Sequence, residues 1–94
     1  MTVYVDDERI VWRGRQWCHL VADSLDELHA FAQRLGLKRA WFQGNATYPH
    51  YDVTVAVRAK ALQQGALPSD RATTVACFKK LKAELVADRA LSPA

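Results

Sequence analysis

The segment SLDELHAFAQRLGL, residues 24–37, constrains the fold most because it predicts one amphipathic helix with both of its ends marked. Ser24 and Glu27 have the spacing of a capping box, in which the two side chains satisfy free backbone N–H groups at the helix start. Gly36 supplies the left-handed residue that often follows the last turn of a helix. Between these ends, apolar residues at helical spacing form a single stripe: Leu25, Leu28, Phe31, Ala32 and Leu35. Such a stripe needs an apolar partner surface.

Strand-like segments lie on both sides of this helix. Residues 2–6 and 16–23 alternate and contain β-branched residues, and they predict two strands joined through a turn at Gly14. Residues 39–43, RAWFQ, predict a third strand because they are aromatic and strand-like in composition. Residues 66–69, ALPS, are consistent with a very short fourth strand.

Two further helices are predicted after a loop at residues 44–52, GNATYPHYD. Thr54 has the position of an N-cap for a helix that Gly65 ends. A longer helix is expected from residue 70 to about residue 89. Strands separated by helical segments predict an α/β domain, with a small three- to four-stranded, at least partly parallel sheet and about three helices.

The composition fits a single domain over residues 1–94. Half of the residues are apolar and 24% are charged, which is ordinary for a globular chain. No apolar run approaches the roughly 20 residues that cross a bilayer, and no signal peptide is visible, so we expect a cytoplasmic protein. Cys18 and Cys77 form no C-x-x-C pair and are expected to be buried and free. Residues 91–94 should fray.

Charge is distributed unevenly along the chain, whose formal net charge is +3. Residues 1–30 carry six acidic and three basic side chains, whereas residues 31–94 carry four acidic and ten basic ones. A basic region of this size is compatible with a polyanionic partner without requiring one.

Several short sequence blocks occur along this chain in the same order as in one known protein family. The blocks are TVYVDD at 2–7, WCHLVADSLDELHAFAQRLGL at 17–37, WFQ at 41–43 and HYDVT at 50–54, followed by Arg58 and Gly65-Ala66. Over about residues 1–67 the chain is similar to the small bacterial and phage proteins grouped as domain of unknown function 4031. The resemblance implies that the protein is located in the cytoplasm of a bacterium or of a phage-infected host. It implies no activity, because none is established for the family.

This chain departs from the family pattern at two places. The pattern has a Lys-Arg pair shortly after the threonine of HYDVT, where this chain has Val57-Arg58, so only the arginine carries over. The helix expected over residues 70–90 has no counterpart in the resemblance, which leaves residues 1–67 as the family-like core.

Histidines and carboxylates are expected to gather at one edge of the sheet. In parallel α/β sheets, ligands bind beyond the carboxyl ends of the strands. Asp6 and Asp7 follow the first predicted strand, and His19 lies on a partly covered face of the second predicted strand. His50 and Asp52 lie in the loop that is expected at the same edge. Such a group could bind a divalent metal or carry out acid–base catalysis. Alternatively, the acids only end strands and cap helices, since no metal-binding spacing such as H-E-x-x-H is present.

The three histidines differ in what their neighbours indicate. His50, between Pro49 and Tyr51, fits a functional residue and equally a residue that pins its loop through a hydrogen bond. His29, at the edge of the apolar stripe, is expected to be a solvated or half-buried helix residue.

A basic site is expected at the start of the helix that follows HYDVT, because the N–H groups and the dipole of a helix start attract anions. The expected ligand-binding residues are Thr54, Arg58, Lys60 and Tyr51. Other basic and aromatic side chains could contact phosphates and stack on bases, or form an ordinary solvated surface. They are Arg13, Arg15, Lys38, Arg39, Trp12, Trp17 and Trp41.

Two main functions from different classes follow. The first is a phage or bacterial accessory module that binds a phosphate-bearing ligand, either nucleic acid or a nucleotide. The alternative is a metal-assisted hydrolase or nuclease that uses Asp6, Asp7, His19, His50 and Asp52. A protein that inhibits a host enzyme is a third class. A ligand site predicts that His50, Asp52 and Arg58 converge on one cleft, with Asp6 or Asp7 on its opposite wall.

The last helix carries an apolar row of Phe78, Leu81, Leu85 and Val86. This row either packs on the domain's own sheet or forms a homodimer contact, since two-fold pairing is the commonest assembly.

Overall fold

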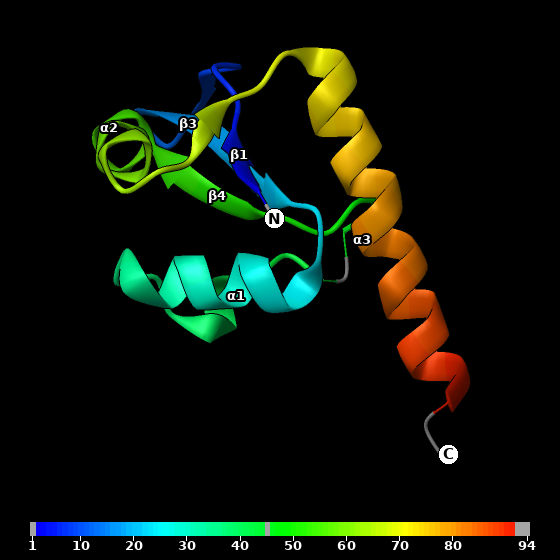
Figure 1. Cartoon of the computed structure of the whole chain (residues 1–94). Coiled ribbons are helices and arrows are strands. Elements are labelled where there is room, and N and C mark those ends of the chain that lie inside the picture. Colours follow the sequence, from blue (N-terminus) through cyan, green and yellow to red (C-terminus); the bar gives the residue numbers. More distant parts are fainter. Residues whose placement is uncertain (1, 45, 92–94) are drawn as a thin grey trace.

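Five strands and three α-helices follow one another along residues 2–44 and 46–91, the part of the chain described by a computed structural model (Figure 1). In chain order the elements are β1 (Val3–Val5), β2 (Ile10–Trp12), β3 (Arg15–Ala22), α1 (Leu25–Arg34), the 3₁₀-helix η1 (Arg39–Trp41), β4 (Tyr51–Thr54), α2 (Val55–Gln63), β5 (Leu67–Pro68) and α3 (Arg71–Leu91). The predicted α/β class is confirmed, with one strand more than expected. Of the tail expected to fray, Leu91 ends α3 and residues 92–94 lie outside the described residues.

β3 is the central strand of the sheet. It pairs antiparallel with β1 and β2 along one edge and with β4 along the other, because Trp17 and Leu20 each have one partner in β4 and a second in β2 or β1. β5 pairs parallel with β1. The sheet is therefore partly parallel, as predicted, but the strands that carry His19 and Asp52 are antiparallel neighbours.

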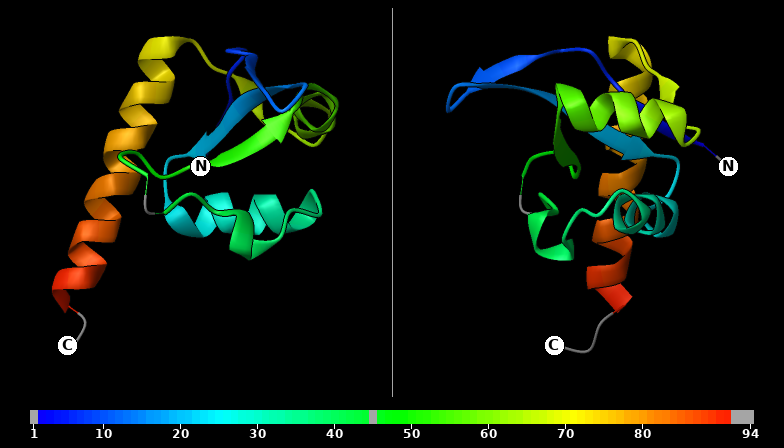
Figure 2. Two further views of the ribbon diagram at one scale, coloured as in Figure 1. Left: turned by 180° about the vertical axis from the view of Figure 1, so that it is seen from behind. Right: turned by 90° about the vertical axis from the view of Figure 1, so that its left-hand side faces the viewer.

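Helices cover both faces of this sheet. α1 lies on the face that carries Tyr51, because the Tyr51 hydroxyl is 2.8 Å from Nδ1 of His29 in α1. α3 reaches the other face, where Phe78 lies edge-on to His19 with 5.6 Å between the ring centroids. In two views the strands lie between α2 and α3, with α1 running beneath them (Figures 1 and 2).

α1 forms as the sequence predicts. The Ser24 hydroxyl accepts a hydrogen bond from the Glu27 N–H at 3.3 Å, and Gly36 adopts a φ of 86° just after the helix. The apolar stripe of α1 packs into one core cluster with β-strand residues such as Val5 and Leu20. Cys18 and Cys77 are both free and buried, as expected, and both belong to this cluster.

Three predictions of local structure are wrong. Arg39–Trp41 form a 3₁₀-helix instead of a strand, and the aromatic residue that follows, Phe42, packs its side chain against the core without belonging to the sheet. Tyr51 and Asp52 belong to β4 instead of the expected loop. β2 was not predicted, because its three residues are all apolar and show no alternation along the sequence, although all three are exposed in the structure.

The inner turns of α3 pack on the domain's own body. Leu81 is buried, and Phe78 and Leu85 pack against the core, whereas Val86 is 53% exposed. A homodimer contact through this helix stays a prediction. Within the described residues, no helix combines the length and the apolar character needed to cross a bilayer.

Candidate metal-binding site

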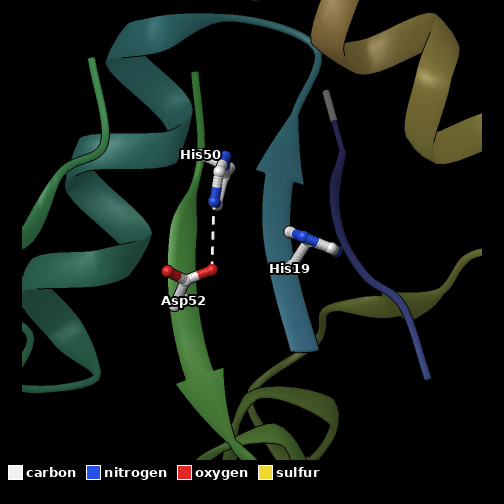
Figure 3. Close-up of side chains that lie close together, drawn as sticks. All are labelled: His19, His50 and Asp52. Atoms are coloured by element: carbon white, nitrogen blue, oxygen red, sulfur yellow. Dashed lines mark ion pairs between the residues drawn. The ribbon is translucent and has the colours of Figure 1, made fainter. Parts of the chain in front are cut away.

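The pairing of β3 with β4 brings His19, His50 and Asp52 to one face of the sheet. His19 and Asp52 are directly opposite each other in the antiparallel register, so their side chains point the same way. His50 lies directly before the first residue of β4, and the contact of its Nε2 with Asp52 Oδ1 places it on the same side of the sheet. Figure 3 shows the three side chains together over β3 and β4.

The three side chains are close enough to share one metal ion. One ligand atom from each residue can be chosen so that all three atoms lie within 4.8 Å of one another. His50 Nε2 is 3.0 Å from Asp52 Oδ1, and the two imidazole centroids are 4.9 Å apart at 79°. The side chains of His19, His50 and Asp52 are 18%, 14% and 39% exposed, so the group is sheltered but reachable.

Asp6 holds His19 in one orientation. Its Oδ1 accepts from the His19 backbone N–H at 2.8 Å, and its Oδ2 lies 2.6 Å from His19 Nδ1. A carboxylate accepts hydrogen bonds, so Nδ1 carries the proton and the lone pair of neutral His19 is on Nε2. Asp6 itself is only 3% exposed.

The electrostatics of this pair favour the charged forms of both residues. The hydrogen bond from Asp6 raises the pKa of His19 and outweighs the lowering effect of burial. Burial acts to raise the pKa of Asp6, but the hydrogen bonds and the charge of His19 together bring that pKa below its ordinary value.

A backbone carbonyl two residues earlier in the chain orients the ring of His50. Its Nδ1 lies 2.8 Å from the carbonyl oxygen of Tyr48, which only accepts, so Nδ1 carries a proton. In neutral His50 the Nε2 lone pair would then face the Asp52 carboxylate at 3.0 Å, which is repulsive. Either a proton on Nε2 or a cation shared with Asp52 removes this repulsion.

A cavity of about 770 Å³ opens beside the three residues. The described residues that line it are Ile10, Val11, Trp12, Arg15, Trp17, His19, Leu37, Ala40, Trp41, Gln43, His50, Asp52, Val53, Thr54 and Val57. A volume of this size is in the range of small-molecule binding sites. His19, His50 and Asp52 thus meet a space that can hold a ligand.

The comparison with protein families identifies the chain. The family described as "Protein of unknown function (DUF4031)" matches residues 3–81. The chain belongs to this family. No curated protein and no solved structure matches it. The matched residues include the whole three-residue group and reach Leu81 in α3, well beyond the segment over which the sequence blocks suggested the resemblance.

In this DUF4031 chain, the expected convergence with Arg58 does not occur. Arg58 Nε donates to the backbone carbonyl of Asp6 at 2.7 Å and lies 3.8 Å from Asp7 Oδ1. Asp7 is exposed and pairs with Arg9 at 2.6 Å. Arg58 and Asp7 are not among the residues that line the cavity, so Arg58 ties α2 to the end of β1.

The other expected ligand-binding residues also lie apart from one another. The Thr54 hydroxyl caps α2, accepting from the Val57 N–H at 3.3 Å, and Thr54 lines the cavity. Lys60 is exposed on α2. Tyr51 is only 1% exposed, so it is a core residue and offers no surface to a ligand.

The structure brings His19, His50 and Asp52 together, but not in the way that the sequence analysis expected. The group assembles across an antiparallel pair and not at the carboxyl ends of parallel strands. Reading HYD with a period of two would have placed His50 and Asp52 on one face. Phe78, whose ring centroid lies 5.8 Å from that of His50, was expected only as part of an apolar row. No local signal connects it with the site.

Proposed function

We propose that His19, His50 and Asp52 bind a divalent transition-metal ion and that this DUF4031 protein is a metal-dependent hydrolase acting in the adjoining cavity. One observation carries the proposal: ligand atoms of two histidines and one carboxylate lie within 4.8 Å of one another and face a cavity of about 770 Å³.

The ligand set suits a catalytic metal. Imidazole nitrogen favours ions such as Zn²⁺, Fe²⁺ and Ni²⁺ over Mg²⁺ and Ca²⁺, which prefer oxygen ligands. Two histidines and one carboxylate supply three ligands, and catalytic zinc sites typically use three protein ligands plus water. A bound ion of this kind lowers the pKa of its water to about 7, which provides a nucleophile for hydrolysis at neutral pH.

The surrounding contacts support this assignment. Ligating histidines usually donate their second ring N–H to a carboxylate or a carbonyl oxygen, which fixes the ring and the tautomer. His19 donates to Asp6 and His50 donates to the Tyr48 carbonyl. In both rings the nitrogen left for a metal is therefore Nε2.

Calorimetric titration of metal-free protein with Zn²⁺, Mn²⁺ and Mg²⁺ tests the site. We expect one Zn²⁺ per chain, bound more tightly than Mg²⁺, and a rise in melting temperature because an ion that binds only the folded state stabilises it. His50→Gln should remove this binding. His29→Gln is the matched control, since His29 lies outside the group and contacts Tyr51 instead. Binding that survives His50→Gln, or no binding of any ion, would refute the proposed site.

Hydrolysis is tested with the zinc-loaded protein on three chromogenic substrates: bis(p-nitrophenyl) phosphate, p-nitrophenyl phosphate and p-nitrophenyl acetate. Release of p-nitrophenol that depends on both the metal and His50 supports a hydrolase and indicates its bond type. A protein that binds zinc but hydrolyses none of the three would keep its metal site and lose the proposed activity.

A further inference from the structure

The tryptophans of this protein gather at the cavity beside the metal-ligand group. The chain contains three tryptophans, and Trp12, Trp17 and Trp41 all line that cavity. Trp12 is 57% exposed and Trp41 is 51% exposed, so neither side chain is buried in the hydrophobic core. Large aromatic rings left half in water beside a cavity are typical of a surface that binds a flat ligand.

A tight hairpin holds one of these rings in place. Arg13 and Gly14, between β2 and β3, have φ values of 51° and 73°, as in the two-residue turns that match the twist of paired strands. Trp17 Nε1 donates to the Trp12 carbonyl at 3.1 Å, and the two rings meet edge to face at 6.2 Å. Trp12 is therefore presented on a rigid support.

Cations accompany the exposed rings on both sides. The Arg13 guanidinium lies 4.6 Å from the centroid of Trp12, and Lys38 Nζ lies 5.7 Å from the centroid of Trp41. Arg15 lines the cavity itself. Among the lining residues that the structure describes, Asp52 is the one acid, and it belongs to the metal-ligand group. The cavity thus combines aromatic walls with a positive rim.

We propose that the ligand of this cavity is single-stranded nucleic acid, with bases stacked on Trp12 and Trp41 and phosphates contacted by Arg13, Arg15 and Lys38. Proteins that bind single strands combine these two features, aromatic platforms and a basic groove. A duplex hides its bases inside the stack and offers no free face to tryptophan. As a statement about substrate, the inference rests on the proposed hydrolase, because a strand held here would place a phosphodiester near His50 and Asp52.

The positions of the cations favour a strand over a single nucleotide. Arg13 and Lys38 sit beside the two exposed rings but are not among the residues that line the cavity. Positive charge therefore extends beyond the space that one nucleotide fills. A single strand carries several phosphates that can contact these cations, whereas a mononucleotide carries one phosphate group and can contact only some of them.

Binding is measured with metal-free protein in EDTA, so that the result does not depend on the metal site. The probe is a fluorescein-labelled twelve-nucleotide dT strand, followed by anisotropy, and quenching of tryptophan fluorescence reports directly on the cavity. Competitors are a duplex of equal length and thymidine 5′-monophosphate. We expect the strand to bind, the duplex and the mononucleotide to compete at least tenfold more weakly, and the affinity to fall as salt rises.

Variants locate the binding surface. Trp12→Ala and Trp41→Ala should each weaken strand binding roughly 5- to 150-fold, the equivalent of about 1–3 kcal/mol per stacked base. Trp12→Phe should restore most of the affinity, because it keeps an aromatic face. Val86→Ala, at a residue of similar exposure on α3, should leave it unchanged.

Each result decides between the two proposals separately. No strand binding at low salt, equal competition by the duplex or mononucleotide, or equal affinity of the tryptophan variants and Val86→Ala would overturn this inference. Strand binding in EDTA together with failure to bind any metal would uphold it and refute the hydrolase. Metal binding without strand binding would uphold the proposed metal site and refute this inference.

Discussion

The two histidine–carboxylate pairs of this protein use the same chemical groups in opposite ways. Asp6 is 3% exposed and accepts from both the backbone and the ring of His19. The Asp52 side chain is 39% exposed and contacts His50 from two residues away along the chain. One carboxylate lies behind its histidine, and the other shares the cavity with it.

This difference assigns the two carboxylates to different tasks. Asp6 has both oxygens occupied by His19, so it fixes the tautomer of that ring and has no oxygen left for a metal. Asp52 lies beside His50 Nε2 at 3.0 Å and belongs to the group whose ligand atoms lie within 4.8 Å of one another, so it is the expected metal ligand. In this pair of carboxylates, the buried and fully hydrogen-bonded Asp6 positions a histidine, whereas the partly exposed Asp52 is free to contact a ligand.

The largest effect should come from Asp52→Asn. Losing an anionic ligand should lower Zn²⁺ affinity by more than the roughly 10- to 100-fold that follows the loss of an outer-shell partner. Folding stability should change by no more than about 0.5 kcal/mol, because the side chain is partly exposed. Calorimetry and urea unfolding of the same samples check both values. A variant that binds zinc normally would make Asp52 no more than a partner of His50.

The next largest effect is expected for Asp6→Asn. The amide NH₂ group cannot accept from His19 Nδ1, which releases the tautomer, so zinc affinity should fall roughly 10- to 100-fold. Unlike Asp52→Asn, this change should also destabilise the metal-free fold by about 1.5–3 kcal/mol, the range for hydrogen bonds to charged groups. Asp7→Asn, at the next residue and exposed, is the control for both measurements. If the two variants behave alike, Asp6 has no positioning role.

The pH dependence of metal-free protein sharpens the same contrast. The raised pKa of His19 contributes stability that is complete below the unfolded value of about 6.5 and is lost as pH rises through the folded value. The lowered pKa of Asp6 contributes stability above its ordinary 3.8 that is lost as pH falls through the folded value. The stability of wild type should therefore exceed that of Asp6→Asn most between about pH 3.8 and pH 6.5, where both contributions are complete, and the excess should shrink on either side. Urea unfolding of both proteins from pH 3 to 9 gives this difference, and a difference independent of pH would contradict the assignment.

The smallest effect separates Arg58 from Lys60 on α2. Arg58→Ala removes the bond to the Asp6 carbonyl and should cost about 1 kcal/mol of stability, with zinc and strand affinities changed less than twofold. Lys60→Ala, at an exposed residue of the same helix, should change neither property. Loss of ligand binding in Arg58→Ala at unchanged stability would restore Arg58 to the site.

The sequence predicted what depends on local patterns. α1 has its capping box and its stripe within one segment, so its ends and its buried face followed directly from spacing. The α/β class followed from the order of segments. The chemistry of imidazole and carboxylate groups marks His19, His50 and Asp52 as candidates, and a parallel sheet would bring them to one edge together with Asp6 and Asp7.

What the sequence could not supply depends on long-range pairing. Asp52 lies opposite His19 because of the register between β3 and β4. No local sequence pattern indicates which residues face each other across two strands. β2 consists of three consecutive apolar residues, Ile10–Trp12, so its sequence has no alternation that would indicate a strand with one buried face. Trp41 was placed in a strand, although in a 3₁₀-helix it turns outward to the cavity and is half exposed.

The register of β3 against β4 has a further consequence for folding. A slip of one residue would send every side chain of β4 to the opposite face, and Asp52 would leave His19. A metal ion bound at this site would therefore stabilise the native register of the two strands over any shifted register. It would also act as a removable cross-link between distant parts of the chain. Amide hydrogens of Tyr51–Thr54 should then exchange more slowly once zinc is added.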